Sequence, residues 1–274
     1  MRVFTAGREL VREFSTGLTE AHGITAVDDE DGECVWVADP AEKIRTTDED
    51  GRYEFVRVGA HGRVAKFTLD GRLVRELPVP SHPAYEEHRF APTAVAAGTD
   101  RIWVADGYGN NLVHAFTADG IYESTLEGEF DCPHGLLLDR RGDEHELYVA
   151  DRENSRIQVY GVDGVFRRTV GEGELRRPCS MATSGDLLLV AELEARLAVF
   201  DGKDGLVGYI GADDEAAQRP GWPNAETADG RTVRPPLRHG HFNSPHGLAV
   251  DTEGRPLVTE WLIGGRTTRL TARD

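Results

Sequence analysis

A short apolar segment that ends in Val-Ala-Asp or a close variant recurs five times along the 274-residue chain. The copies read VWVADP at 35–40, IWVADG at 102–107, LYVADR at 147–152, LLVAEL at 188–193 and LVTEWL at 257–262. A shorter apolar run precedes each copy. An apolar-aromatic run and an Asp-Gly-type turn follow most of them, as in VHAFTADG at 113–120 and IQVYGVDG at 157–164. A repeat of this kind decides the fold class before any single residue does.

The runs are four to six residues long, rich in Val, Ile, Leu and aromatic residues, and separated by Gly, Asp and Asn turns. This pattern indicates antiparallel β-meanders, and no stretch shows sustained helical periodicity. Repeats of about 40 residues with about four strands each are typical of a β-propeller. We therefore predict one all-β domain over residues 1–274, built from four-stranded antiparallel blades, of which five full repeats are visible.

Three stretches lie outside the repeat. The segment VFTAGRELVREF at 3–14 resembles the third and fourth strands of a repeat, so we expect residues 1–14 to complete the last blade and close the ring. Residues 39–62 and 212–244 read as inserted loops, either of which could form a lid that alters substrate choice. The polar, Pro- and Gly-rich stretch 205–244 is too poor in strand formers to contain a sixth repeat.

Three His-Gly pairs stand at the same place in three repeats: His22 in AHGITAVD, His134 in PHGLLLD and His246 in PHGLAVD. Equivalent places in equivalent modules would aim the three imidazoles at one point. Three imidazoles with an open fourth position make a catalytic type of metal site. We predict a divalent transition metal there, zinc foremost, with iron, manganese or nickel as alternatives.

A plainer interpretation of these pairs is a turn whose imidazole bonds to neighbouring backbone. The corresponding places in the other two repeats read APTAV at 91–95 and RPCSMA at 177–182. Histidine is therefore not required by the turn, which favours the metal hypothesis.

An acidic residue ends each of the five second strands. Recurrence in every repeat argues for a structural role, such as accepting backbone N–H bonds in the following turn. These residues are Asp39, Asp106, Asp151, Glu192 and Glu260. Glu260 is also a candidate substrate contact, because Trp261 follows it and Arg266 lies close behind in the sequence.

Charge and cysteine content narrow the choice of partners. The formal net charge of −17 disfavours nucleic acid and anionic membranes, whose binding depends on basic patches. No run of about 18 apolar residues occurs and the start lacks an apolar signal core, so we expect a cytoplasmic protein without a membrane partner. The three cysteines show no framework spacing, which indicates reduced thiols. The expected partner is a small-molecule substrate, and the oligomeric state stays open.

Two longer motifs carry a family resemblance: IWVADGYGNNLVHAF at 102–116 and ADRENSRIQVY at 150–160. Together with the His-Gly pairs, they resemble the NHL-repeat propellers and, among these, the peptidyl-α-hydroxyglycine α-amidating lyases. The resemblance implies six blades, a zinc ion in the central channel, and cleavage of a carbinolamide C–N bond to an amide and glyoxylate. It also implies that the three histidines hold the metal, that Tyr108 is the catalytic tyrosine, and that Arg152 binds substrate or stabilises charge.

The chain departs from this family in three respects. It has no recognisable counterpart of the lyases' extra N-terminal blade and its active-site arginine, and their disulfide cysteines are replaced. Gly247 follows the third histidine, where the family has a calcium-binding aspartate. Tyr108 could instead be a packing aromatic, and Arg152 could form a surface ion pair with Glu153.

Two classes of function follow. The first is a metal-dependent lyase acting at the propeller axis on a small α-hydroxy or carbinolamide-like substrate. In it the metal is the Lewis acid, Tyr108 the acid or base, Arg152 the anion-binding group, and Glu260 a further contact. Hydrolase, isomerase or hydro-lyase chemistry on a polyhydroxylated substrate is the alternative within the enzyme class. The second class is a non-catalytic NHL propeller that binds a protein or carbohydrate, since fold alone does not decide function.

Overall fold

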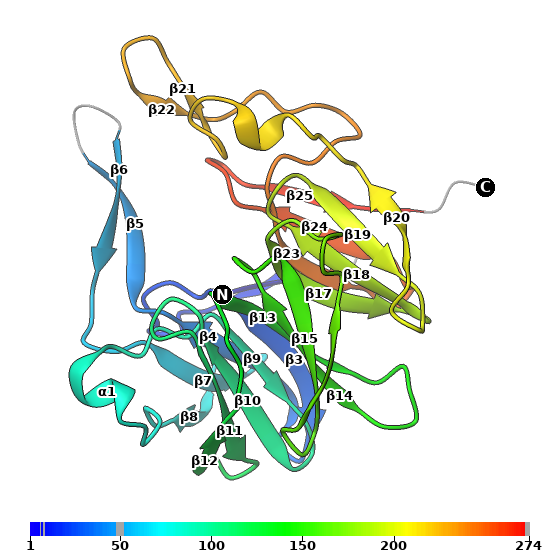
Figure 1. Cartoon of the computed structure of the whole chain (residues 1–274). Helices are drawn as coiled ribbons and strands as arrows, with labels where there is room; N and C mark the ends of the chain where they lie inside the picture. The colour runs from blue at the N-terminus through cyan, green and yellow to red at the C-terminus, as the bar shows by residue number, and fades with distance from the viewer. Residues whose placement is uncertain (6, 8, 48–51, 272–274) are drawn as a thin grey trace. The chain divides into compact units, whose positions relative to one another are not determined.

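The recurring unit of the fold is a blade of three or four strands paired antiparallel in chain order (Figure 1). The computed structural model describes residues 1–5, 7, 9–47 and 52–271. The first blade comprises β3 (Ile24–Asp29), β4 (Gly32–Asp39), β7 (Arg63–Thr68) and β8 (Leu73–Leu77). The second comprises β9 (Ala94–Ala97), β10 (Arg101–Asp106), β11 (Leu112–Thr117) and β12 (Tyr122–Thr125).

Three more blades follow along the chain. The third comprises β13 (Pro133–Asp139), β14 (Glu146–Asp151), β15 (Arg156–Gly161) and β16 (Phe166–Val170). The fourth comprises β17 (Pro178–Ser184), β18 (Leu187–Glu192), β19 (Arg196–Phe200) and β20 (Leu206–Ile210). The fifth comprises β23 (Pro245–Val250), β24 (Pro256–Glu260) and β25 (Arg266–Arg269). All five predicted second strands are strands, and the predicted all-β class of propeller blades is confirmed.

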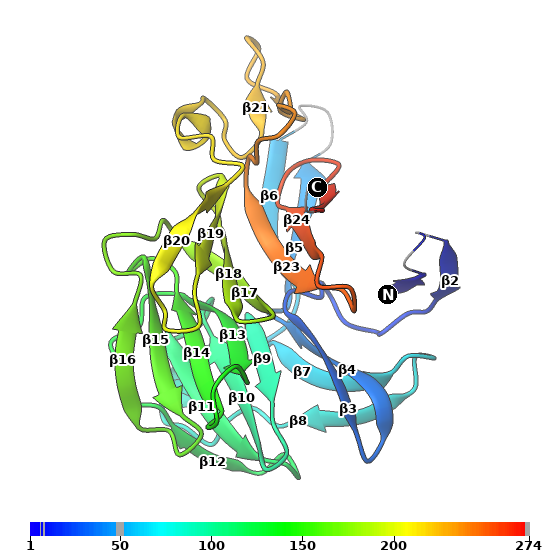
Figure 2. The ribbon, with the colours of Figure 1, turned by 90° about the vertical axis from the view of Figure 1, so that its right-hand side faces the viewer.

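The chain forms two compact units, each with cores of its own between stacked blades. In the unit of residues 1–43 and 55–129, β9 contacts β3 and β4, and Trp36, Val104 and Phe116 pack into the shared core. In the unit of residues 44–54 and 130–274, β17 contacts β13 and β23, and Tyr148 and Phe200 belong to the core. Figure 2 shows the third and fourth blades side by side. Because the middle strands are buried on both faces, they read as continuous apolar runs rather than alternating ones.

The segments between blades contain short elements. Residues 39–62 include the hairpin of β5 (Glu42–Thr47) and β6 (Arg52–Arg57), and residues 48–51 of this insertion lie outside the described residues. Helix α1 (Ala84–Glu87) precedes the second blade. Residues 212–244 include the 3-10 helix η1 (Ala216–Gln218) and the paired strands β21 (Ala225–Glu226) and β22 (Thr232–Val233).

Residues 1–14 form a pair of strands in the unit of residues 1–43 and 55–129, and their expected completion of the last blade stays a prediction. Strand β1 (Arg2–Phe4) pairs with β2 (Leu10–Glu13), and the fifth blade has three strands within the described part of the chain. All four residues of β2 are exposed, so neither face of this strand contributes buried apolar surface.

No helix among the described residues is long and apolar enough to cross a lipid bilayer. Cys34, Cys132 and Cys179 are free and buried. Burial raises the pKa of the Cys132 thiol to about 11 and that of Cys179 to about 12, so both thiols are protonated at neutral pH.

Candidate metal and active-site residues

The imidazole of His22 is fixed by the backbone of the next blade. His22 lies just before β3, where its N–H donates to the carbonyl oxygen of Ala38 at 2.8 Å. Its Nδ1 lies 2.7 Å from the carbonyl oxygen of Thr93, at the start of the second blade. A carbonyl oxygen only accepts, so Nδ1 carries the proton and Nε2 bears the lone pair.

His134 repeats this arrangement in the other unit. It lies in β13 with 3% of its surface exposed, and its Nδ1 lies 3.0 Å from the carbonyl oxygen of Cys179. Cys179 and Thr93 occupy the places in their own repeats that the histidines occupy in theirs. In both histidines the Nδ1–H donates to a backbone carbonyl, and Nε2 is the nitrogen that can bind a metal. Metal-binding histidines usually donate their other ring N–H in this way.

The glycines of the first two His-Gly pairs, Gly23 and Gly135, have a separate structural cause. A Cβ on Gly23 would lie 2.4 Å from the carbonyl oxygen of Thr93, and one on Gly135 would lie 2.4 Å from that of Cys179. Neighbouring blades approach too closely at this point for any side chain. The glycine is thus required by packing, whereas the histidine beside it is not.

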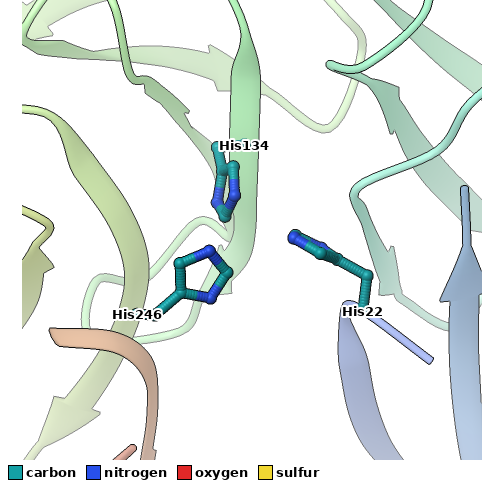
Figure 3. Close-up of side chains that lie close together, drawn as sticks. All are labelled: His22, His134 and His246. Atoms are coloured by element: carbon teal, nitrogen blue, oxygen red, sulfur yellow. The ribbon is translucent and has the colours of Figure 1, made fainter. Parts of the chain in front are cut away.

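His246 lies next to His134. Both are in the unit of residues 44–54 and 130–274, and their ring centroids are 4.7 Å apart at an interplanar angle of 88°. Figure 3 shows these two rings edge to face. The strands that carry them, β13 and β23, both contact β17. Trp261 lies beyond His246, with ring centroids 6.2 Å apart.

Tyr108 lies against His22, as their places in the sequence of blades suggested. The Tyr108 hydroxyl is 3.2 Å from Nε2 of His22, and the two rings meet edge to face with centroids 5.1 Å apart. Because Nε2 bears the lone pair, the hydroxyl is the donor. The Tyr108 N–H donates to the carbonyl oxygen of Ala91 at 3.2 Å, which fixes the turn after β10.

A buried polar network supports this turn. Asp106 accepts hydrogen bonds from the N–H of Ala91 at 2.6 Å, from the N–H of Asn110 at 2.8 Å and from the Tyr85 hydroxyl at 2.8 Å. The Tyr85 oxygen is 2.5 Å from Nε2 of His114, whose Nδ1 lies 2.9 Å from the Thr125 hydroxyl. Since the Tyr85 proton goes to Asp106, Nε2 of His114 is the donor to Tyr85.

His114 is neutral in this network. It is fully buried, and burial lowers its pKa to about 3, with His82 nearby acting in the same direction. Burial also raises the pKa of Asp106. Sequence inspection did not single out Tyr85 or His114. The one available signal was a polar residue in the otherwise apolar strand LVHAFT at 112–117.

Arg152 is mostly buried, with 12% of its side chain exposed, and its Nε donates to Glu153 at 2.9 Å. Arg177 donates to the same oxygen of Glu153 at 2.6 Å. Burial alone would raise the pKa of Glu153, but the hydrogen bonds and charges of Arg177 and Arg152 outweigh it and hold this pKa below its usual value. The Arg152–Glu153 pair is therefore present, and the role of Arg152 toward a substrate anion stays a prediction.

Glu260 has structural contacts. One carboxylate oxygen accepts the N–H groups of Asn243 at 2.6 Å and Ser244 at 3.1 Å, and the other pairs with Arg266. Equivalent bonds join Asp39 to the N–H of Thr19 and Asp151 to the N–H of Asp131. The structural role of these acids is thus confirmed, with partners in the turn that opens the same blade. These contacts of Glu260 are structural, and its role in catalysis stays a prediction.

Glu192, at the end of β18, is fully buried. Its carboxylate pairs with Arg196. Burial raises its pKa to about 7, although Arg196 acts in the opposite direction.

Comparison with protein-family models identifies the type of repeat. The family model described as NHL repeat matches residues 130–160, which span the third-blade strands β13, β14 and β15. This confirms the resemblance to the NHL-repeat propellers.

The relatives are amidating enzymes. The chain is 26% identical over 225 residues to the probable peptidyl-alpha-hydroxyglycine alpha-amidating lyase pgal-1 of Caenorhabditis elegans, covering 78% of this chain and 59% of that protein. It is 27% identical over 249 residues to peptidylglycine alpha-amidating monooxygenase of Rattus norvegicus, covering 85% of this chain and 22% of that protein. It is also 29% identical over 199 residues to peptidyl-alpha-hydroxyglycine alpha-amidating lyase 2 of Drosophila melanogaster, covering 67% of this chain and 43% of that protein.

Solved structures support the fold. Virginiamycin B lyase from Staphylococcus aureus matches with a TM-score of 0.53 and 14% identity, covering 93% of this chain and 70% of that one. A catalytically inactive form of that enzyme, crystallised with quinupristin, matches with a TM-score of 0.55 and 16% identity, covering 99% and 85%. At this identity the likeness is one of fold.

Proposed function

We propose that this protein is a metal-dependent lyase that breaks the C–N bond of a carbinolamide-like substrate. The observation that carries the proposal is the shared bond from Nδ1 of His22 and of His134 to a backbone carbonyl, which puts the lone pair of both imidazoles on Nε2, the nitrogen that can bind a metal. The amidating lyases among the relatives support the same class of reaction. We retain a small-molecule substrate as the expected partner.

The proposed metal ligands are His22, His134 and His246. Each offers one imidazole nitrogen, and their equivalent places in three repeats support a shared ion. Neutral imidazole suits zinc, and iron, manganese or nickel would also fit. A bound divalent ion would supply Lewis-acid polarisation of a substrate oxygen.

Tyr108 is the proposed acid and base. Its hydroxyl donates to Nε2 of His22. A metal ion bound to that nitrogen would take its lone pair, so the hydroxyl would lose this acceptor beside a cation and give up its proton to solvent more readily. In the reaction, the ionised phenol oxygen takes the proton of the carbinol hydroxyl. The carbonyl forms as the C–N bond breaks, and the same proton passes to the leaving amide nitrogen. From an α-hydroxyglycine the products are a primary amide and glyoxylate.

Arg152 is the proposed partner of the substrate carboxylate. A planar guanidinium binds a carboxylate through two parallel N–H bonds. Its present partner is Glu153, which Arg177 also holds, so Glu153 keeps a cation when Arg152 turns to the substrate. Cytoplasmic location remains part of the proposal. The net charge of −17 supports the absence of nucleic-acid and anionic-membrane partners.

The test measures the metal content of the protein and its turnover of an α-hydroxyglycine substrate. The untagged protein is reconstituted with zinc, its metal content is measured, and glyoxylate release from N-acetyl-α-hydroxyglycine is followed. About one equivalent of metal together with glyoxylate release is the expected result. Metal-bound protein that releases no glyoxylate would overturn the reaction, and protein that takes up no metal would favour a non-catalytic binding propeller.

A further inference from the structure

A groove of about 520 Å³ lies beside Tyr108 in the unit of residues 1–43 and 55–129. It is lined by Tyr108 together with Arg57, Glu87, His88, Arg89 and Asn110. The side-chain amide of Asn110 donates to the carbonyl oxygen of Arg89 at 2.9 Å. The segment that carries Arg89 is therefore tied to the turn that carries Tyr108, and a group bound in the groove is held at a fixed place relative to the phenol.

Arg89 has a donor left over for a ligand. Its Nη1 donates to Glu42 at 2.6 Å and its Nη2 to the carbonyl oxygen of Pro40 at 2.5 Å. Its Nε is buried and has no hydrogen-bond partner among the described residues. A buried N–H without an acceptor is unfavourable, so an oxygen atom placed there by a ligand would be stabilised.

Two guanidinium groups meet beside the groove. Arg57 and Arg89 both approach the same oxygen of Glu42, at 3.6 Å and 2.6 Å, so they share one carboxylate. His88 and the exposed Glu87 also line the groove. Since Glu42 and Glu87 balance the charge of the two arginines, the planar guanidinium groups are what a bound carboxylate would recognise.

Building on the lyase function proposed above, we propose that the substrate has a second carboxylate at the far end of its acyl group, and that Arg89 and Arg57 bind it in this groove. A carboxylate matches the flat guanidinium group and accepts the unused Nε–H of Arg89. The groove selects substrates with an acidic acyl tail, and Tyr108 at its wall acts on the carbinol end.

The test compares matched substrates. A series of N-acyl-α-hydroxyglycines, with tails from succinyl to suberoyl, is assayed against the same series with the tail carboxylate replaced by carboxamide. At one or more tail lengths the wild type is expected to prefer the carboxylate by about tenfold in kcat/KM. Arg57→Gln and Arg89→Lys are expected to lose most of this preference through a higher KM, with the bound metal unchanged. Arg72→Gln, at an exposed arginine outside the groove, is the control and is expected to keep it.

Equal kcat/KM for both series at every length would overturn the inference while leaving the lyase reaction intact. If no substrate in either series is turned over, calorimetry with the amide products decides separately. Succinamate and its longer homologues are then expected to bind more tightly than the corresponding diamides, and Arg57→Gln to abolish the difference. Equal binding of acids and diamides would overturn the inference without reference to catalysis.

Discussion

A 3.0 Å hydrogen bond joins Nδ1 of His134 to the backbone carbonyl of Cys179, and it connects the third blade to the fourth. The bond orients the His134 imidazole through the backbone carbonyl oxygen of residue 179, and every amino acid has that oxygen. The His134 imidazole is therefore oriented by the backbone of the fourth blade.

His134→Ala is expected to abolish metal binding, because it removes one of three proposed ligands. The expected value is a loss of about one equivalent of transition metal, measured by elemental analysis after reconstitution. His241→Ala is the matched control, since the Nδ1 of His241 also bonds to a backbone carbonyl, that of Ala212, outside the histidine trio. Equal metal content in wild type and H134A would remove His134 from the site.

Gly135→Ala is expected to lower the free energy of unfolding by about 1–3 kcal/mol, because the new methyl group would overpack the junction of two blades. The added Cβ would lie 2.4 Å from the carbonyl oxygen of Cys179. The measurement is urea unfolding, and Gly208→Ala serves as control because no atom lies within 4 Å of its added Cβ. A G135A variant as stable as G208A would show that the blades separate freely at this point.

Tyr108→Phe is expected to keep the metal and to lose turnover by roughly 10²- to 10⁴-fold, the usual contribution of a positioned acid or base. The ring contact with His22 survives in the phenylalanine, and only the hydroxyl is lost. Tyr209→Phe, at a tyrosine that donates to the carbonyl oxygen of Glu174, is the control. Unchanged kcat in Y108F would exclude the hydroxyl from the reaction.

Stability is expected to fall on mild acidification, in part through His114. Its pKa is about 3 in the folded protein and near 6.5 in the unfolded chain, so only the unfolded chain takes up this proton between those values. The contribution of neutral His114 is complete above pH 6.5 and is lost as the pH falls toward 3, by at most about 1.4 kcal/mol per pH unit.

His114→Gln, which keeps polar atoms in the network, is expected to show a shallower dependence of unfolding free energy on pH between 6.5 and 4. His145→Gln, at an exposed histidine, is the control. Identical pH slopes in wild type and H114Q would contradict the assignment.

The strands were predictable from the sequence because the middle strands of a blade are buried on both faces and read as continuous apolar runs. The proximity of His134 to His246 also followed from their places in the repeat, whereas a role for Tyr108 near the histidines was implied by the family resemblance. The carbonyl partners of the histidines were not predictable, because every residue has a backbone carbonyl and the sequence does not show which one will accept the bond.

The hairpin of residues 1–14 shows a different limit. Both strands form, and their completion of the last blade stays a prediction, because a strand pattern does not state which neighbour a strand will pair with. The link from Tyr85 to His114 was hidden for a related reason, because the two residues come from separate elements, α1 and β11, and meet only after the blade has folded.

The hairpin of β5 and β6 leaves the first blade after β4 and returns at β7, and Asp39 and Arg63 at the two ends of the excursion are direct partners in the sheet. The blade would close in the same register if the hairpin were shortened, exchanged or removed. Arg57, at the end of this hairpin, could therefore change without disturbing the histidines. Descendants of this chain could acquire new substrate preferences by altering one replaceable segment while inheriting the chemistry intact.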